Sequence, residues 1–137
     1  MSPSTSTPPA PIAPASITTA NVAVVVGTLS SDPRVTHLPS GDTIVNYEIS
    51  TETPDGRLSV PVQIAGGARL PALKAADTVV AIGPVRRRFF RAGGATMSRT
   101  EVVARVIGKP GSARVAKAVA AVGDALASGG VPQAREG

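Results

Sequence analysis

The sequence predicts an all-β domain, and three observations support this fold class. Short runs of alternating apolar and polar residues recur along the chain, with turn sequences between them at intervals of about 10 to 15 residues. The clearest alternation is RLSVPVQIA at 57–65, whose apolar side comprises Leu58, Val60, Val62 and Ile64. Apolar residues at helical spacing over several turns occur only near the C-terminus.

The N-terminal segment, residues 1–19, has a composition that disfavours folding. It is rich in Pro, Ser and Thr and has no charged residue, so it can neither bury a core nor sustain hydrogen-bond ladders. We therefore expect a disordered arm at 1–19, a folded domain at 20–109, a helix at 110–128 and a flexible tail at 129–137.

Three strands are expected in the first half of the domain. The first is NVAVVVGTLS, ended by an Asp-Pro turn, and the second is TIVNYEIST, in which Tyr47 falls on the apolar face and should belong to the core. The third is RLSVPVQIA. Because Pro61 has no N–H, this strand should lie at an edge or contain a bulge there.

The second half of the domain predicts a short helix and two more strands. Residues 66–76 lack alternation and are expected to form one or two helical turns, and strands should follow at 77–90 and 97–107. In the last strand Glu101 should face outward, and the inward face should comprise Thr100, Val102, Ala104 and Val106. Three strands, a short helix and two strands is the order of a five-stranded Greek-key barrel, the OB-fold.

An added C-terminal helix is predicted from about 112 to 128. Its apolar stripe is formed by Val115, Val119, Val122 and Leu126. The polar face offers Arg114 and Lys117 against Asp124, which favours a structural or oligomeric role over a membrane-surface one.

Composition limits the functions that this chain can perform. The formal charge of +5 and the pI near 10.8 favour a polyanionic partner. There is no cysteine, the single histidine (His37) lies near a turn, and the acids are scattered, so we expect no metal site, no cofactor and no enzymatic activity. No signal peptide and no run of about 20 apolar residues is visible, which predicts a cytoplasmic protein without a membrane partner.

The candidate binding site is a run of arginines around two aromatic residues, GPVRRRFFRAGG at 83–94. In an extended strand Arg86, Arg88 and Phe90 share one face, while Val85 and Phe89 point the other way, towards the core or a partner subunit. Guanidinium groups beside a ring suit single-stranded nucleic acid, because they neutralise phosphates while the ring stacks on a base. The alternative is a solvated basic hairpin. Further positive charge nearby comes from Arg91, Arg99 and Arg105.

Four segments, in order along the chain, carry a resemblance to a known family: NVAVVVGTLSSDP, LPSGDTIVNY, LKAADTVVAIGPVRRRFF and TEVVA. Over about residues 21–107 they resemble the bacterial single-stranded DNA-binding proteins. The resemblance implies an OB-fold, a homo-oligomer (a tetramer, or a dimer), nucleoid association, and non-specific binding of single-stranded DNA in replication, recombination and repair. It also places binding on Arg86, Arg88 and Phe90, and Arg34, Arg91 and Arg99 complete the expected set.

The chain departs from that family's pattern in several places. Ser59 and Ala65 stand where stacking aromatic residues are expected, and His37 stands where the family often has Tyr. The C-terminus lacks the family's acidic tip, so recruitment of repair enzymes by that route is not expected. These departures leave an alternative function open, an OB-fold interaction or assembly subunit with weak or no DNA binding. Single-stranded RNA is a further alternative, because charge and stacking do not read the sugar.

Overall fold

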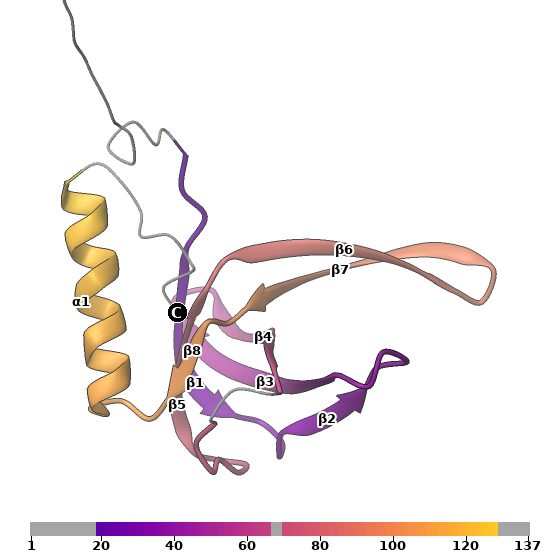
Figure 1. Ribbon diagram of the computed structural model, residues 1–137, viewed down its shortest axis with the longest axis horizontal. Coiled ribbons are helices and arrows are strands. Elements are labelled where there is room, and N and C mark those ends of the chain that lie inside the picture. The colour runs from indigo at the N-terminus through magenta and orange to yellow at the C-terminus, as the bar shows by residue number, and fades with distance from the viewer. Residues whose placement is uncertain (1–18, 67–69, 129–137) are drawn as a thin grey trace, which may run out of the picture. The chain divides into compact units, whose positions relative to one another are not determined.

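A computed structural model describes residues 19–66 and 70–128, and most of these residues lie in strands (Figure 1). The all-β prediction with one C-terminal helix is confirmed. All the strands belong to a compact unit spanning Asn21–Ala116, and the helix continues from there into a second unit. The predicted tail and all of the predicted arm except residue 19 lie outside the described residues.

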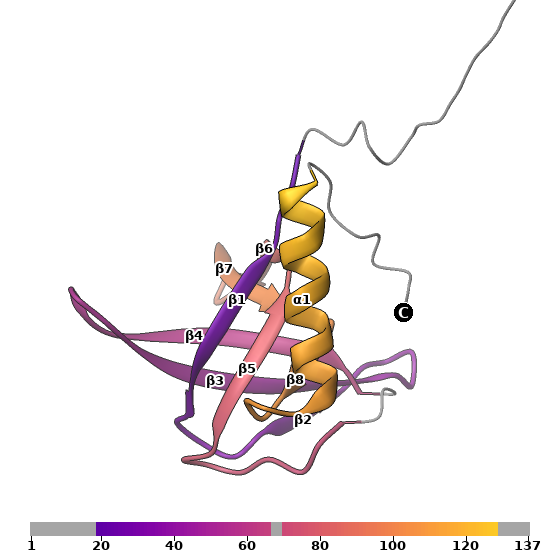
Figure 2. The ribbon, with the colours of Figure 1, turned by 90° about the vertical axis from the view of Figure 1, so that its left-hand side faces the viewer.

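Within the described part of the chain, eight strands form one sheet. In chain order they are β1 (Ala23–Leu29), β2 (Arg34–His37), β3 (Thr43–Thr53), β4 (Gly56–Ala65), β5 (Thr78–Gly83), β6 (Val85–Ala92), β7 (Ala95–Val103) and β8 (Val106–Gly108). Their order in the sheet is β6-β7-β4-β3-β1-β5-β8, with β2 paired to β3. Neighbouring strands are antiparallel except β4 and β7, which pair in parallel at Val62 and Gln63. Figure 2 shows β1 and β5 side by side, running across the direction of β3 and β4.

Two of the predicted strands are each divided in the structure. The strand expected at 77–90 is β5 followed by β6, because Pro84 has no N–H for the ladder and the pairing partner changes there from β1 and β8 to β7. The strand expected at 97–107 is β7 followed by β8. The two breaks contact each other, since the Val103 N–H donates to the Pro84 carbonyl (2.8 Å) and the Arg105 N–H donates to the Ile82 carbonyl (2.7 Å).

The helix predicted within residues 66–76 is not found in the described part of that segment, which starts again at Leu70. Two carboxylates organise this segment as a turn instead. Asp32 Oδ1 accepts the Ala75 N–H (2.9 Å), and Asp77 Oδ2 accepts the Lys74 N–H (3.0 Å). The backbone hydrogen bond from Lys74 is also the main reason that the pKa of Asp77 lies below its ordinary value.

The hydrophobic core contains much of the apolar faces predicted for the strands, but Ile107 replaces Val106 in it, because the last strand is interrupted between Val103 and Val106. It comprises Leu29, Tyr47, Ile49, Val62, Ile64, Val79, Ala81, Val102, Ala104 and Ile107. Tyr47 is buried as predicted, and this burial raises its pKa. Leu58 and Thr100, which were expected to face inward, are exposed because their ends of β4 and β7 extend past the region where these two strands pair. Strand β4 lies between β3 and β7, so the predicted edge strand is not found. Pro61 itself is paired with β3 alone, since the pairing with β7 begins at Val62.

The C-terminal helix is confirmed as α1 (Ala113–Ala127). Ser112 caps it, because its Oγ accepts the Val115 N–H at 3.3 Å. Val115 is the buried residue of this helix, and Val119 and Leu126 are exposed. Among the described residues, no helix combines the length and the apolar character that a membrane crossing requires.

Candidate nucleic-acid interface

Strand β6 presents its arginines on two faces, as the alternation of a strand requires. Arg86 and Arg88 lie on the same face and both donate to Glu101 Oε2 on β7, from Nη2 at 2.7 Å and from Nε at 3.1 Å respectively. Arg86 also donates to Gln63 Oε1 on β4 (3.0 Å). The predicted arginine pair is therefore held in place by acceptors on two neighbouring strands.

Glu101 is the acidic centre of this arrangement. It faces away from the core as predicted, yet it is only 3% exposed, because Arg86, Arg88 and Arg99 cover it. Burial by itself would raise the pKa of Glu101, but hydrogen bonds from Arg86 and Arg88 outweigh burial and keep the pKa below its ordinary value. Glu101 therefore lies on the predicted face but is buried there, and a charged carboxylate lies beneath the arginines.

A second acid, Glu48 of β3, also belongs to the site. Its Oε2 accepts from Arg99 Nη2 at 3.1 Å, and its Oε1 accepts from the Ser59 hydroxyl at 2.7 Å. Ser59 is one of the two positions where a stacking aromatic residue was expected. In this chain Ser59 positions the Glu48 carboxylate and has no ring that could stack on a base.

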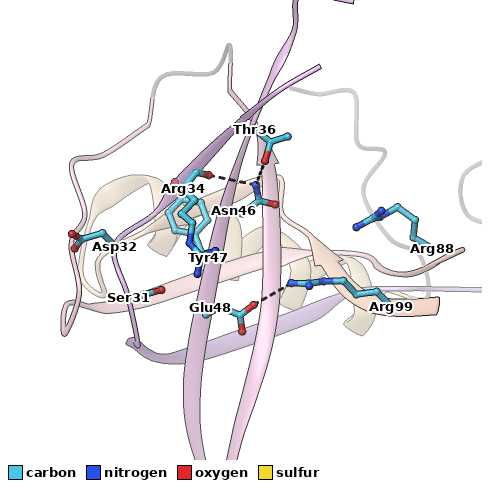
Figure 3. A pocket seen from close by; sticks show the side chains of 9 residues that line it. All are labelled: Ser31, Asp32, Arg34, Thr36, Asn46, Tyr47, Glu48, Arg88 and Arg99. Atoms are coloured by element: carbon cyan, nitrogen blue, oxygen red, sulfur yellow. Dashed lines mark hydrogen bonds and ion pairs between the residues drawn. The ribbon is translucent and has the colours of Figure 1, made fainter. Parts of the chain in front are cut away.

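Two adjoining hollows form a groove beside these side chains. The larger, of about 410 Å³, is lined by Ser31, Asp32, Arg34, Thr36, Asn46, Tyr47, Glu48, Arg88 and Arg99 (Figure 3). The smaller, of about 250 Å³, is lined by Thr36, Leu38, Ile44, Asn46, Gln63, Arg86 and Arg88. Because they share Thr36, Asn46 and Arg88, we treat them as one surface and call it the arginine groove.

The middle of the arginine groove is polar and uncharged. Figure 3 shows Asn46 between Arg34 on one side and Arg88 and Arg99 on the other. The Asn46 side-chain amide donates to Thr36 Oγ1 (2.9 Å) and to the Arg34 carbonyl (3.4 Å), which fixes β2 against β3. Among the described residues, Arg34 is the groove arginine that makes no ion pair.

Charge in the groove is more balanced than the sequence suggests. Four arginines of the predicted set line or flank it, namely Arg34, Arg86, Arg88 and Arg99. Three acids accompany them, Asp32, Glu48 and Glu101. Sequence reasoning identified the arginines from their clustering on one strand, but it missed Glu48 and Asp32, which the fold brings from other strands and turns.

The two phenylalanines lie on opposite faces of β6. Phe90 shares the face of Arg86 and Arg88, is 37% exposed, and has the Arg88 guanidinium 5.4 Å from its ring centre. Phe89, expected to face the core or a partner, is 63% exposed, with the Arg87 guanidinium 5.4 Å from its ring centre. The sixth predicted site residue, Arg91, is on this second face and so is not part of the groove.

Other candidate residues lie outside the groove. His37 is exposed at the end of β2, and Ala65 is exposed at the end of β4, where it offers no ring. No cluster of three or more His, Cys, Asp or Glu that could hold a metal ion is present in the described part of the chain. No protein-family model matches the chain, and no curated protein sequence matches it.

Proposed function

We propose that this chain is an OB-fold protein that binds single-stranded DNA without sequence specificity. The observation that carries the proposal is the arginine groove, in which arginines from β2, β6 and β7 line one surface and an exposed ring, Phe90, lies on the same face of β6. A groove that offers cations to phosphates and a ring to a base is the arrangement that single-stranded nucleic acids require.

The strand pairing supports the OB-fold part of the proposal. With β5 and β6 taken as one segment and β7 and β8 as another, β1 pairs with β3 and β5, and β4 pairs with β3 and β7. Pairing of β6 with β7 and of β5 with β8 then completes a ring of five segments. A partly open five-stranded barrel is the OB-fold architecture, and β2 is an extra strand added to β3.

The proposed mechanism follows from the contacts in the groove. Arg86 is oriented by its hydrogen bond to Gln63 and Arg88 by its contact with the Phe90 ring, so a strand of DNA meets guanidinium groups that need little reordering. Phe90 supplies a stacking platform worth about 1 to 3 kcal/mol per base. Because the rings expected at Ser59 and Ala65 are missing, phosphate contacts should provide most of the affinity, and binding should weaken steeply with salt.

Assembly into a homo-oligomer, a tetramer or a dimer, is part of the proposal. Residues 23–27 of β1 pair only with β5, so one edge of this segment has no partner among the described residues, and Val24 and Val26 are exposed there. A second copy could add its strand to this edge. Several weak sites on one assembly would then act together on a long strand of DNA. A location in the cytoplasm at the nucleoid belongs to the same proposal.

The test is a fluorescence-anisotropy titration of a labelled poly-dT oligomer at low and at physiological salt, with a duplex and an RNA oligomer of equal length as controls. Submicromolar binding at physiological salt that prefers single-stranded DNA supports the proposal. Binding that ignores strandedness would contradict it.

Two variants connect that test to the groove. Phe90→Ala should weaken binding by about 1 to 3 kcal/mol with little change in salt slope. Arg34→Gln should make the salt slope shallower by about 0.7, since one phosphate contact is lost and Arg34 has no ion pair to release. Equal binding by both variants and the original protein would exclude the arginine groove as the site.

A second function, an OB-fold interaction or assembly subunit with weak or no DNA binding, has one observation in its favour. Arg86, Arg88 and Arg99 are all paired with acids in the structure. An arginine that binds a phosphate loses its ion pair with the acid, so the net gain in binding free energy is smaller. An oligomer that fails to bind poly-dT at low salt would favour this second function.

A further inference from the structure

The face of β6 opposite the arginine groove carries a second basic and aromatic set, Arg87, Phe89 and Arg91, which we call the outer face. Phe89 has the largest exposed fraction of the large apolar side chains described, 63%. The Arg87 guanidinium lies 5.4 Å from its ring centre. A ring so exposed, with a cation beside it, has the same chemistry as Phe90 and Arg88 on the groove face.

The outer face differs from the groove in its charge balance. Across the ladder, Arg87, Phe89 and Arg91 are opposite Thr100, Ser98 and Thr96, none of which is charged. Within the described residues neither Arg87 nor Arg91 forms an ion pair, and Arg91 donates only to the Gly94 carbonyl (3.1 Å). Because these guanidinium groups have no acid to leave, each gains its full electrostatic attraction to a phosphate.

Both faces of this ribbon are open to a ligand. Strand β7 pairs with β4 only at Val102 and Val103, so from Arg86 to Arg99 the backbones of the described strands β6 and β7 pair only with each other. Figure 1 shows the β6–β7 ribbon running out beyond the other strands of the sheet. A flexible polyanion can therefore pass around its edge from one face to the other.

We propose that the outer face is a second subsite for single-stranded nucleic acid, in which Phe89 stacks on a base while Arg87 and Arg91 bind phosphates. This inference rests on the proposed function and extends the bound strand around the β6–β7 ribbon. A second copy of the chain is a poorer occupant, because a symmetric contact through this face would bring the arginines of both copies together without an acid between them.

Tryptophan fluorescence tests the two faces separately, since the chain has no Trp of its own. Phe89→Trp and Phe90→Trp each place a single fluorophore on one face, and each variant is titrated with poly-dT. Quenching of both supports the outer subsite. Quenching of Phe90→Trp alone overturns it and leaves the proposed function intact, whereas no quenching in either variant overturns both. A change in Phe89→Trp emission that depends on protein concentration without DNA identifies a second copy as the occupant and also overturns the subsite.

Affinity measurements give an independent test. Phe89→Leu keeps an apolar side chain but removes the ring, so it should weaken binding by roughly 5- to 150-fold, while Phe89→Tyr should bind like the original protein. Arg87→Gln should make the salt slope shallower by about 0.7. The matched control is Arg57→Gln, which removes an exposed arginine that is paired with Glu52 on the β3–β4 hairpin and should leave the slope unchanged. Equal effects of the Arg87 and Arg57 variants would overturn the subsite.

Discussion

Replacing Glu101 with glutamine should strengthen the binding of single-stranded DNA. The substitution keeps the shape of the side chain and one acceptor oxygen, but it removes the negative charge that Arg86 and Arg88 share at 2.7 and 3.1 Å. Arg86 retains its hydrogen bond to Gln63, and Arg88 retains its contact with the Phe90 ring, so both arginines stay near their present positions.

The size of the effect follows from Coulomb's law. A phosphate oxygen bound to the far edge of either guanidinium would lie about 6 Å from the Glu101 carboxylate, where two like charges repel by about 0.7 kcal/mol in water and about 1.4 kcal/mol at an effective dielectric constant near 40. These low repulsion energies apply because the side chains of Arg86 and Arg88 are 45% and 42% exposed, so water screens the charges. Removing this repulsion corresponds to about three- to tenfold tighter binding at low salt. The salt slope should steepen by about 0.7 if one more phosphate is neutralised.

The assay is an anisotropy titration with poly-dT at several salt concentrations between about 50 and 200 mM, where slopes of this kind are measured. Glu52→Gln is the matched control, since it makes the same charge change on the β3–β4 hairpin, where Glu52 pairs with Arg57. Weaker binding by Glu101→Gln at an unchanged slope would refute the reasoning, because it would mean that Glu101 acts by holding the arginines and not by competing with phosphate.

The remaining predictions concern stability. The folded pKa of Glu101 is below its ordinary value of 4.5, so its ion pairs stabilise the fold above that pH and are lost as pH falls through the folded pKa; acid titration of the thermal midpoint should show a smaller decline for Glu101→Gln. Burial raises the pKa of Tyr47 above 10.0, so stability should fall as pH rises past that value, and Tyr47→Phe should remove this fall in a urea titration at high pH. Gly83→Ala should lower the free energy of unfolding by about 1 to 3 kcal/mol or more, since the new Cβ would meet the backbone of Val103 and Ala104; an unchanged urea midpoint would contradict it. Gly123→Ala should instead raise helix stability by about 0.5 to 1 kcal/mol, since its new Cβ meets nothing within 4 Å, and circular dichroism should report more helix on heating.

Sequence alternation predicted the parts of the fold that have one buried face. In β3 and β4 the residues that alternate in sequence, such as Tyr47, Ile49, Val62 and Ile64, are those that reach the core. The helical stripe predicted α1 in the same way. Strand β2 was missed because all four of its residues are exposed, so its sequence has no apolar periodicity to detect.

The site was predicted on one strand and missed across strands. Arg86, Arg88 and Phe90 share a face because residues two apart in a strand always do. Glu48 and Ser59 are 11 residues apart and meet only because β3 and β4 pair in the observed register. Glu101 was correctly placed on the outward face. Its burial depends on long arginine side chains from β6 and β7, and the alternation of apolar and polar residues does not reveal that one polar side chain covers another.

The isolation of the β6–β7 ribbon bears on how this protein can evolve. Every residue from Val85 to Thr100 is exposed, and the core lies in other strands and at the end of β7. Except at Arg86, Arg88 and Arg99, which pair with the buried Glu101, substitutions along the ribbon therefore cost the fold little, since exposed positions far from the core usually change stability by less than about 0.5 kcal/mol. The rings and the charges that have no acid partner can be exchanged one at a time while the sheet remains folded, so ligand preference can diverge between descendants of this chain faster than their architecture does.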